Sequence, residues 1–190
     1  MLRRRGFIGS ALPVALGAAG ASPLLAQGSA DFAAALREGG CALLLRHAQT
    51  EAGVGDPPGF RVDMCSTQRN LSNEGRAQAR RIGEWLSARG LRPAAVLSSA
   101  WCRCRDTADL AFGRHALWPA LNSFFGTSEG GKEQAAQMRA ALLRLPRQQF
   151  EAWVTHQVNV TALTGAFIGM GEAFVVDARG QVLARQPFGA

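Results

Sequence analysis

Histidine and arginine side chains follow three separate apolar runs of this 190-residue sequence. Arg46 and His47 come directly after one run, and His156 comes directly after another. Arg103 stands in a polar segment that follows a third run. Arginine binds phosphate oxygens in a bidentate manner, one imidazole can attack phosphorus, and a second can donate to the oxygens as charge shifts during transfer. If these side chains meet, the chemistry they suit is that of one phosphoryl group.

The apolar runs are the elements that must bring these side chains together. The segment 41–45 is continuously apolar and follows Gly39 and Gly40, which is the pattern of a strand buried on both faces of a sheet. Other short runs alternate with segments whose apolar residues recur every three or four positions, as in helices. The predicted strands are 41–45, 94–97, 117–121, 152–155, 172–176 and 181–184. The predicted helices are 31–38, 72–89, 101–112, 135–145 and 158–168.

This alternation predicts the α/β class, and within it a three-layer α/β/α sandwich with a mostly parallel central sheet. A chain of this length holds one such core, and we expect a single domain over residues 31–190. Ligands of open α/β sheets bind outside the carboxyl ends of strands. Because Arg46, His47, Arg103 and His156 follow such ends, they are predicted to converge on one pocket.

Four motifs occur in order around these residues. They are Leu45-Arg46-His47-Ala48; Leu71-Ser72 with Gly75 and Gln78-Ala79; Ser98-Ser99 with Arg103 and Thr107-Ala108; and Thr155-His156 followed by Gly171-Glu172. Together they resemble the histidine phosphatase superfamily, which contains phosphoglycerate mutases and many phosphatases, and the resemblance spans residues 41–184. It implies a phosphoglycerate mutase-like fold.

The resemblance also implies a role for each side chain. His47 would be the nucleophile that is transiently phosphorylated, and Arg46, Arg103 and His156 would form the phosphate pocket. Water would then hydrolyse the phosphohistidine, so that a phosphomonoester is cleaved without a metal or a cofactor. Mutases of the family carry long insertions that shelter the phosphoenzyme from water, and this chain has little room for them. We therefore expect a phosphatase rather than a mutase.

The sequence departs from the family pattern at two positions. Ala48 stands where glycine usually follows the first histidine, which is tolerated if its backbone angles stay in an allowed region. The family's general acid is commonly a Glu or Asp in the loop after the third strand, and there we choose Glu129. Asp63 and Glu51, in the long loop after the first strand, are its rivals.

The first 26 residues have the pattern of an export signal. Three arginines at positions 3–5 precede an apolar stretch rich in alanine and leucine that ends near Ala26. The arginine pair followed by Gly6 and Phe7 resembles the twin-arginine type of bacterial signal. We expect cleavage after Ala26, with Ala30 as the competitor, and a periplasmic or secreted domain that the export machinery has recognised. An uncleaved membrane anchor is the alternative, although glycines and Pro13 interrupt the stretch.

The net charge of +7 suggests nucleic-acid binding at first sight. Removal of residues 1–26 takes three of the 21 basic residues and none of the 14 acidic ones, which lowers the charge to +4. Tyrosine is absent and the arginines are scattered, so no basic stripe with interleaved aromatic residues is present. We expect no nucleic-acid partner. Arg61 and Arg69 could reach a substrate phosphate, although exposed surface arginines are the simpler interpretation.

The four cysteines, Cys41, Cys65, Cys102 and Cys104, permit one or two disulfides in an oxidising compartment. Spacing does not decide the pairing. We favour Cys65 with Cys102, because both flank the proposed pocket, and we interpret Cys41 as a buried thiol. A zinc site built from Cys65, Cys102, Cys104 and His115 is the alternative, but its two close thiols lack the usual spacing of two residues.

Two other functions remain open at this point. One is an exported domain without catalytic activity that uses the same cationic pocket to bind anionic glycans or phosphates. The other is phosphotransfer of the phosphoglycerate mutase type. The substrate we expect is a small or envelope-derived phosphomonoester, and the sequence does not define it further or predict the oligomeric state.

Overall fold

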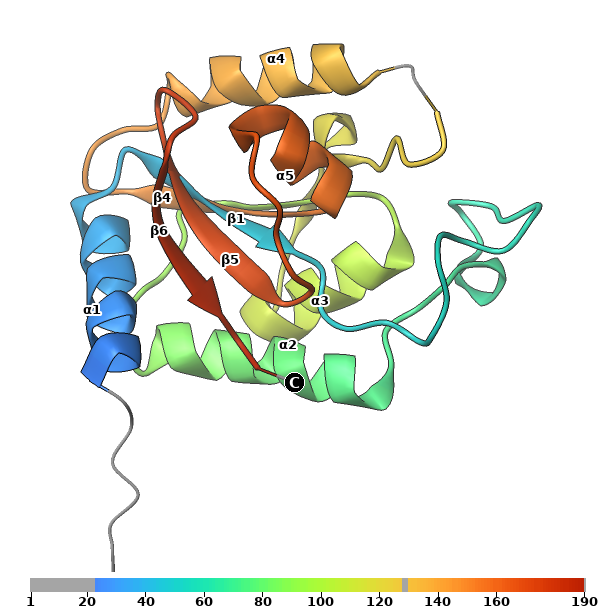
Figure 1. The fold of residues 1–190 in the computed structure, drawn as a ribbon, viewed down its shortest axis with the longest axis horizontal. Coiled ribbons are helices and arrows are strands. Elements are labelled where there is room, and N and C mark those ends of the chain that lie inside the picture. The colour runs from blue at the N-terminus through green and yellow to red at the C-terminus, as the bar shows by residue number, and fades with distance from the viewer. Residues whose placement is uncertain (1–22, 128–129, 190) are drawn as a thin grey trace, which may run out of the picture.

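The computed structural model describes residues 23–127 and 130–189 of the chain, and within them a six-stranded sheet lies at the centre of the molecule (Figure 1). The strand order is β3-β2-β4-β1-β5-β6. Strands β3, β2, β4 and β1 are mutually parallel, whereas β5 is antiparallel to β1 and β6 is antiparallel to β5. The strands are β1 (Cys41–Arg46), β2 (Val96–Ser98), β3 (Ala116–Leu117), β4 (Phe150–Thr155), β5 (Glu172–Asp177) and β6 (Val182–Pro187).

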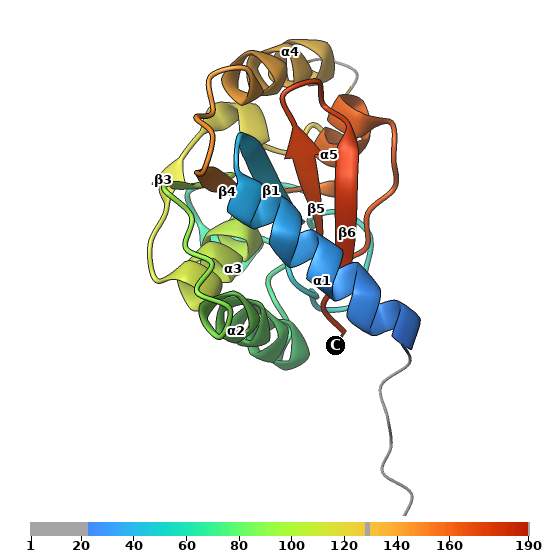
Figure 2. The same cartoon turned by 90° about the vertical axis from the view of Figure 1, so that its left-hand side faces the viewer.

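Helices cover both faces of the sheet. The helices are α1 (Pro23–Glu38), α2 (Asn73–Ser87), α3 (Cys102–Phe112), α4 (Gly131–Leu142) and α5 (Gln157–Thr164). Helices α1, α2 and α3 lie on one side of the sheet, and α4 and α5 lie on the other, as Figures 1 and 2 show. This is the predicted three-layer α/β/α sandwich with a mostly parallel sheet.

Strand β1 divides the core into two parts because its side chains alternate between the two faces. Leu43 and Leu45 pack with the core under α1, α2 and α3, whereas Ala42 and Leu44 pack with the core under α4 and α5. Residues 41–45 are all buried, as predicted for a strand with a helical layer on each side. The polar end of β1 therefore emerges at the sheet edge in a fixed register.

Most element boundaries shift by a few residues from the sequence-based prediction, and α4 (Gly131–Leu142) begins and ends earlier than expected. Helix α1 begins at Pro23, eight residues earlier than expected, and β4 begins at Phe150. Strand β3 contains only two residues, because Pro119 starts a 3-10 turn over Pro119–Leu121 that cannot continue the sheet pairing. Helix α5 ends before Gly165, whose φ of 74° caps it in the left-handed conformation.

The predicted export signal falls mostly on residues 1–22, which lie outside the described residues. In the full chain, α1 runs across the expected cleavage point after Ala26. Cleavage there would retain Phe32 and Leu36, the helix side chains that pack into the core. No helix in the described ranges combines the length and the apolar character needed to cross a membrane.

Candidate active site

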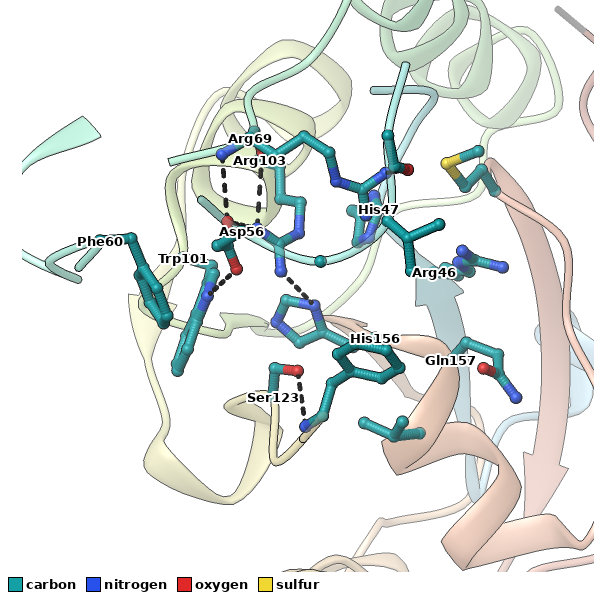
Figure 3. Close-up of a pocket in the computed structure, with 16 residues that line it drawn as sticks. Arg46, His47, Asp56, Phe60, Arg69, Trp101, Arg103, Ser123, His156 and Gln157 are labelled. Atoms are coloured by element: carbon teal, nitrogen blue, oxygen red, sulfur yellow. Dashed lines mark hydrogen bonds and ion pairs between the residues drawn. The ribbon is translucent and has the colours of Figure 1, made fainter. Parts of the chain in front are cut away.

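A pocket of about 460 Å³ lies at the carboxyl ends of β1 and β4 and the start of α3 (Figure 3). Arg46, His47, Arg103 and His156 all line it. The structure therefore brings together the four residues that the sequence assigned to one site.

Backbone carbonyl groups bind both the main-chain amide and the ring of His47. Its amide nitrogen donates to the Thr155 carbonyl on the neighbouring strand at 3.0 Å. Its ring Nδ1 lies 2.9 Å from the Ala48 carbonyl, which can only accept, so Nδ1 carries the proton and Nε2 carries the lone pair. Burial of the ring, reinforced by the charge of Arg103, holds the pKa of His47 well below its ordinary value of 6.5. The imidazole is thus neutral and oriented, as a nucleophile must be.

The start of α2 supports the backbone that follows His47. The Ser72 side chain caps this helix by accepting from the Gly75 amide. Gly75 leaves room for the approach, since a Cβ atom there would lie 1.8 Å from the Gln49 carbonyl oxygen. The buried Gln78 side chain accepts from the Gln49 amide at 2.9 Å. Ala48, which replaces the usual glycine, keeps an ordinary backbone conformation, as expected. Among the non-glycine residues that the structure describes, positive φ occurs at Gln148 and not at Ala48.

His156 faces His47, with ring centroids 5.4 Å apart. Arg103 Nη2, which can only donate, lies 3.4 Å from His156 Nδ1, so that nitrogen accepts and Nε2 carries the proton toward Ser99 Oγ at 2.8 Å. The Ser99 hydroxyl then donates to the Asn122 side chain at 3.3 Å. Burial, together with the charge of Arg103 and the charge that His47 would carry if it were protonated, lowers the pKa of His156 well below 6.5. The Arg103 donor at Nδ1 and the Ser99 hydroxyl at Nε2 therefore set the tautomer of this second imidazole.

Three guanidinium groups in the pocket share one arrangement. Each is bound through Nη1: Arg46 to the Ile168 carbonyl at 2.9 Å, Arg69 to Thr50 Oγ1 at 2.8 Å, and Arg103 to Asp56 at 2.7 Å. Each also has a buried Nε–H without a hydrogen-bond partner among the described residues. Burial lowers the pKa of both Arg46 and Arg69, and a neighbouring guanidinium, Arg69 for Arg46 and Arg103 for Arg69, lowers it further. Clustered cations with unpaired buried donors form a site for an anion.

Asp56 is a charged pocket residue that sequence reasoning missed. Its carboxylate is 7% exposed and accepts from Arg103, from Trp101 Nε1 at 3.0 Å and from the Arg69 amide at 3.1 Å. It is the one acidic side chain among the described residues that line the pocket. Its position in a glycine- and proline-rich loop carries no periodicity or motif that could have marked it.

Neither of the described rivals for the general acid lines the pocket. Glu129, our choice from the sequence, lies outside the described residues. Asp63 is 68% exposed and pairs with Arg61 at 2.7 Å, away from the pocket lining. Glu51 is exposed and does not line the pocket either. The structure also separates the two loop arginines, since Arg69 lines the pocket and Arg61 does not.

The expected disulfide between Cys65 and Cys102 is confirmed, with Cα atoms 5.6 Å apart. It joins the loop after β1 to the first residue of α3, and it excludes the zinc alternative, which needed both thiols free. Burial raises the pKa of the Cys41 thiol to about 11, in line with its interpretation as a buried thiol. Cys104 is also buried, 3.4 Å from His156 Nε2, and burial raises its pKa to about 12.

Comparison with known proteins agrees with this geometry. The sequence model of the histidine phosphatase superfamily (branch 1) matches residues 42–141, more than half of the chain. The chain belongs to the histidine phosphatase superfamily. The matched range contains Arg46, His47 and Arg103, and His156 lies beyond it. A comparison of the sequence with curated proteins finds no match.

Solved structures of the superfamily share the fold. A protein assigned as the phosphohistidine phosphatase SixA of Agrobacterium tumefaciens aligns with a TM-score of 0.53 and 22% identity, covering 77% of this chain and 97% of its own. SixA solved in complex with tungstate aligns with a TM-score of 0.51 and 14% identity, covering 74% and 91%. The mycobacterial glucosyl-3-phosphoglycerate phosphatase Rv2419c, complexed with VO3, aligns with a TM-score of 0.52 and 18% identity, covering 72% and 92%. At these identities the likeness establishes the fold.

Proposed function

We propose that this chain hydrolyses phosphomonoesters through a phosphohistidine on His47, without a metal ion. The observation that carries the proposal is the state of the His47 ring. Its Nδ1–H is committed to the Ala48 carbonyl at 2.9 Å, so Nε2 presents a lone pair in a pocket lined by Arg46, Arg69 and Arg103. The solved relatives support a phosphatase, since their names describe phosphatases of two different substrates.

The first step forms a bond between His47 Nε2 and phosphorus while the bond from phosphorus to the ester oxygen breaks. The ester oxygen leaves with the bonding electron pair and takes up a proton. The guanidinium groups bind the phosphoryl oxygens, and their fixed positions stabilise the charge spread over those oxygens in the transition state. A positive charge develops on His47 as it attacks, and the carbonyl of Ala48 stabilises it through the Nδ1–H bond.

The second step hydrolyses the phosphohistidine. A water oxygen bonds to phosphorus, the bond from phosphorus to Nε2 breaks, and the water gives a proton to the carboxylate that donated one in the first step, which leaves inorganic phosphate and neutral His47. The hydrogen bonds from His156 to Ser99 and from Ser99 to Asn122 hold the second imidazole in one tautomer during both steps. The leaving oxygen's proton is proposed to come from Glu129, because Ser123 and Phe125 of the same loop line the pocket.

The location we propose is the periplasm or the exterior of the cell, after cleavage of residues 1–26. Two features support it. The first is the arginine-led apolar segment at the N-terminus. The second is the disulfide between Cys65 and Cys102, because such bonds persist mainly in oxidising compartments. A small or envelope-derived phosphomonoester would then be the substrate, and phosphoglycerate mutase activity is the less favoured alternative.

The decisive experiment compares the wild-type protein with His47→Ala in the presence of a chelator. With p-nitrophenyl phosphate, we expect His47→Ala to lower kcat by about 10³-fold or more, because the covalent intermediate cannot form. Acid-labile, base-stable phosphate should be trapped on the wild type and not on the variant. His115→Ala is the control, since His115 lies outside the pocket and pairs with Asp109.

Three results would overturn parts of this proposal. Equal turnover by His47→Ala would remove the nucleophile assignment. Wild-type protein that binds inorganic phosphate but hydrolyses no ester would favour the binding domain without catalysis. Loss of turnover in the chelator would show that a metal ion is required.

A further inference from the structure

Aromatic rings form a continuous line from the mouth of the pocket to the nucleophile. The ring of Phe60 lies 6.0 Å from Trp101, Trp101 lies 5.5 Å from His156, and His156 lies 5.4 Å from His47. Figure 3 shows Phe60 and Trp101 together on one side of the pocket, with Arg46 on the opposite side. We call Phe60 and Trp101 the aromatic wall. Its inner end meets the site where the phosphoryl group would bind.

The aromatic wall is held in place by polar contacts. Trp101 is 9% exposed, and its Nε1–H donates to Asp56 at 3.0 Å, which fixes the plane of the indole. Cys102, the residue after Trp101, is joined by the disulfide to Cys65 in the loop that carries Phe60. A ring that is fixed before a ligand arrives can stack against that ligand with little loss of entropy.

Two exposed apolar side chains stand at the mouth of the same pocket. Val54 is 88% exposed and Phe125 is 61% exposed, and both line the cavity. They come from different loops that approach each other, since a Cβ atom on Gly55 would lie 3.4 Å from the Phe125 ring. We call this pair the apolar rim. Exposed apolar groups gathered at the mouth of a cavity are typical of a ligand-binding surface.

The described pocket lining contains four charged side chains, and none of them is available to a second anionic group. They are Arg46, Arg69, Arg103 and Asp56. The three arginines form the anion site described above, and Asp56 already accepts from three donors. The aromatic wall and the apolar rim therefore offer no charged partner to a second anionic group, and they suit an uncharged body of the substrate.

Resting on the hydrolysis proposed above, we propose that the substrates are phosphate monoesters of phenols. The aryl ring lies along the aromatic wall and under the apolar rim, and the ester phosphate lies against His47. Stacked rings gain energy beyond that of area burial, whereas the hydroxyl groups of a sugar would lose water against these side chains without gaining partners. A phenolate is also a better leaving group than an alkoxide, so the bond to phosphorus breaks with less help from a proton donor.

Inhibitors that contain no ester bond show how well the pocket binds the ring, because they have no leaving group whose quality could affect the result. Phenylphosphonate and cyclohexylphosphonate carry the same head group on a flat and on a puckered ring. We expect phenylphosphonate to inhibit hydrolysis of p-nitrophenyl phosphate with a Ki about tenfold lower than that of cyclohexylphosphonate. Equal Ki values, or tighter binding of the puckered ring, would overturn the proposed stacking.

Variants of the apolar rim test the same point by turnover. We compare phenyl phosphate with acetyl phosphate, which has a good leaving group but a small body. The ratio of their kcat/KM values should fall about tenfold in Phe125→Ala, and a smaller fall is expected in Val54→Ser. Phe167→Ala is the matched control, since Phe167 is 68% exposed and does not line the pocket. An unchanged ratio in Phe125→Ala, or glucose 6-phosphate turned over faster than phenyl phosphate, would contradict the substrate class.

The outcomes keep this inference apart from the proposed function. If His47→Ala hydrolyses acetyl phosphate as fast as the wild type, the proposed function fails. If the wild type hydrolyses acetyl phosphate through His47 but shows no preference for phenyl over cyclohexyl compounds, only the substrate class fails.

Discussion

Two halves of the pocket are built in different ways. The inner half consists of Arg46, His47 and His156, which follow the central strands β1 and β4 and inherit their positions from the sheet register. The outer half is the loop 51–70, which carries Asp56, Phe60 and Arg69. It contains little regular structure and is attached to α3 by the Cys65–Cys102 disulfide and the Asp56–Arg103 ion pair. Main-chain pairing positions one half, and side-chain contacts position the other.

This difference suggests that the two halves of the pocket have separate functions. The inner half presents the neutral imidazoles and guanidinium donors that transfer of a phosphoryl group to His47 would need. Under the proposed function, the outer half would set how strongly the anion is bound and which group can be attached to it. Changes in the loop should therefore act mainly on KM, on stability or on substrate choice, and changes at strand ends should act mainly on kcat.

The charges of the two halves are also complementary. Arg46 and Arg103 contribute two positive charges next to His47, but Asp56 of the loop neutralises one of them. Arg69 of the same loop restores a net charge of about two, which matches one phosphoryl dianion. The outer loop thus lowers the positive charge of the site through Asp56 and raises it again through Arg69.

The largest effect that we expect in the loop is that of Asp56→Asn on stability. Removal of one partner from a buried ion pair leaves Arg103 uncompensated among other cations, and we expect the free energy of unfolding to fall by about 3 kcal/mol. Chemical denaturation with and without inorganic phosphate measures this loss. Added phosphate should stabilise the variant more than the wild type, because the anion replaces the missing charge.

Asp63→Asn is the control for Asp56→Asn. Asp63 lies in the same loop and also pairs with an arginine, but its side chain is 68% exposed. Exposed ion pairs contribute about 0–1 kcal/mol, so this variant should stay close to the wild type. If Asp56→Asn unfolds like Asp63→Asn, the ion pair does not hold the loop in place.

A smaller effect is expected from Arg69→Met. Arg69 has a buried Nε–H without a partner in the part of the chain that the structure describes, and it lines the pocket. Loss of one charged hydrogen-bond donor to the phosphate should raise KM about tenfold, with a smaller change in kcat. Steady-state kinetics with p-nitrophenyl phosphate measures both constants.

Arg61→Met supplies the comparison for Arg69→Met, because Arg61 pairs with Asp63 outside the pocket. Its kinetic constants should equal those of the wild type. A fall in kcat with constant KM for Arg69→Met would place Arg69 with the inner half and break the proposed division.

The sequence predicted the inner half well for a physical reason. A continuously apolar run such as 41–45 has one stable place, between two helical layers, and the polar residues after it must then emerge at the sheet edge. His47 and His156 could be brought together without knowledge of any side-chain contact. The same argument predicted the three layers and the parallel core of the sheet.

The outer half was not predictable in this way. No periodicity places Asp56 beside Arg103, since a loop of glycine and proline can follow many paths between its ends. Arg61 and Arg69 are alike in sequence, and only the tertiary structure shows that one is in the pocket. The disulfide was anticipated because both cysteines flank the proposed pocket, and this argument does not depend on the path of the loop.

The smallest perturbation that tests the inner half is a change of pH. Burial holds the pKa values of His47 and His156 well below the ordinary value of 6.5. As pH falls through 6.5, histidines of the unfolded chain gain protons while these two remain neutral, so the free energy of unfolding decreases in this range. NMR titration should show the ring resonances of His47 and His156 in the neutral form at pH 6, with titration midpoints below 6.5. Assignment uses His115→Ala, which removes the third histidine. Bound phosphate should raise both midpoints, because an anion favours the protonated ring. A midpoint at or above 6.5 for His47 in the free protein would mean that the sheet does not deliver a neutral nucleophile, and the distinction between the two halves would then lose its chemical basis.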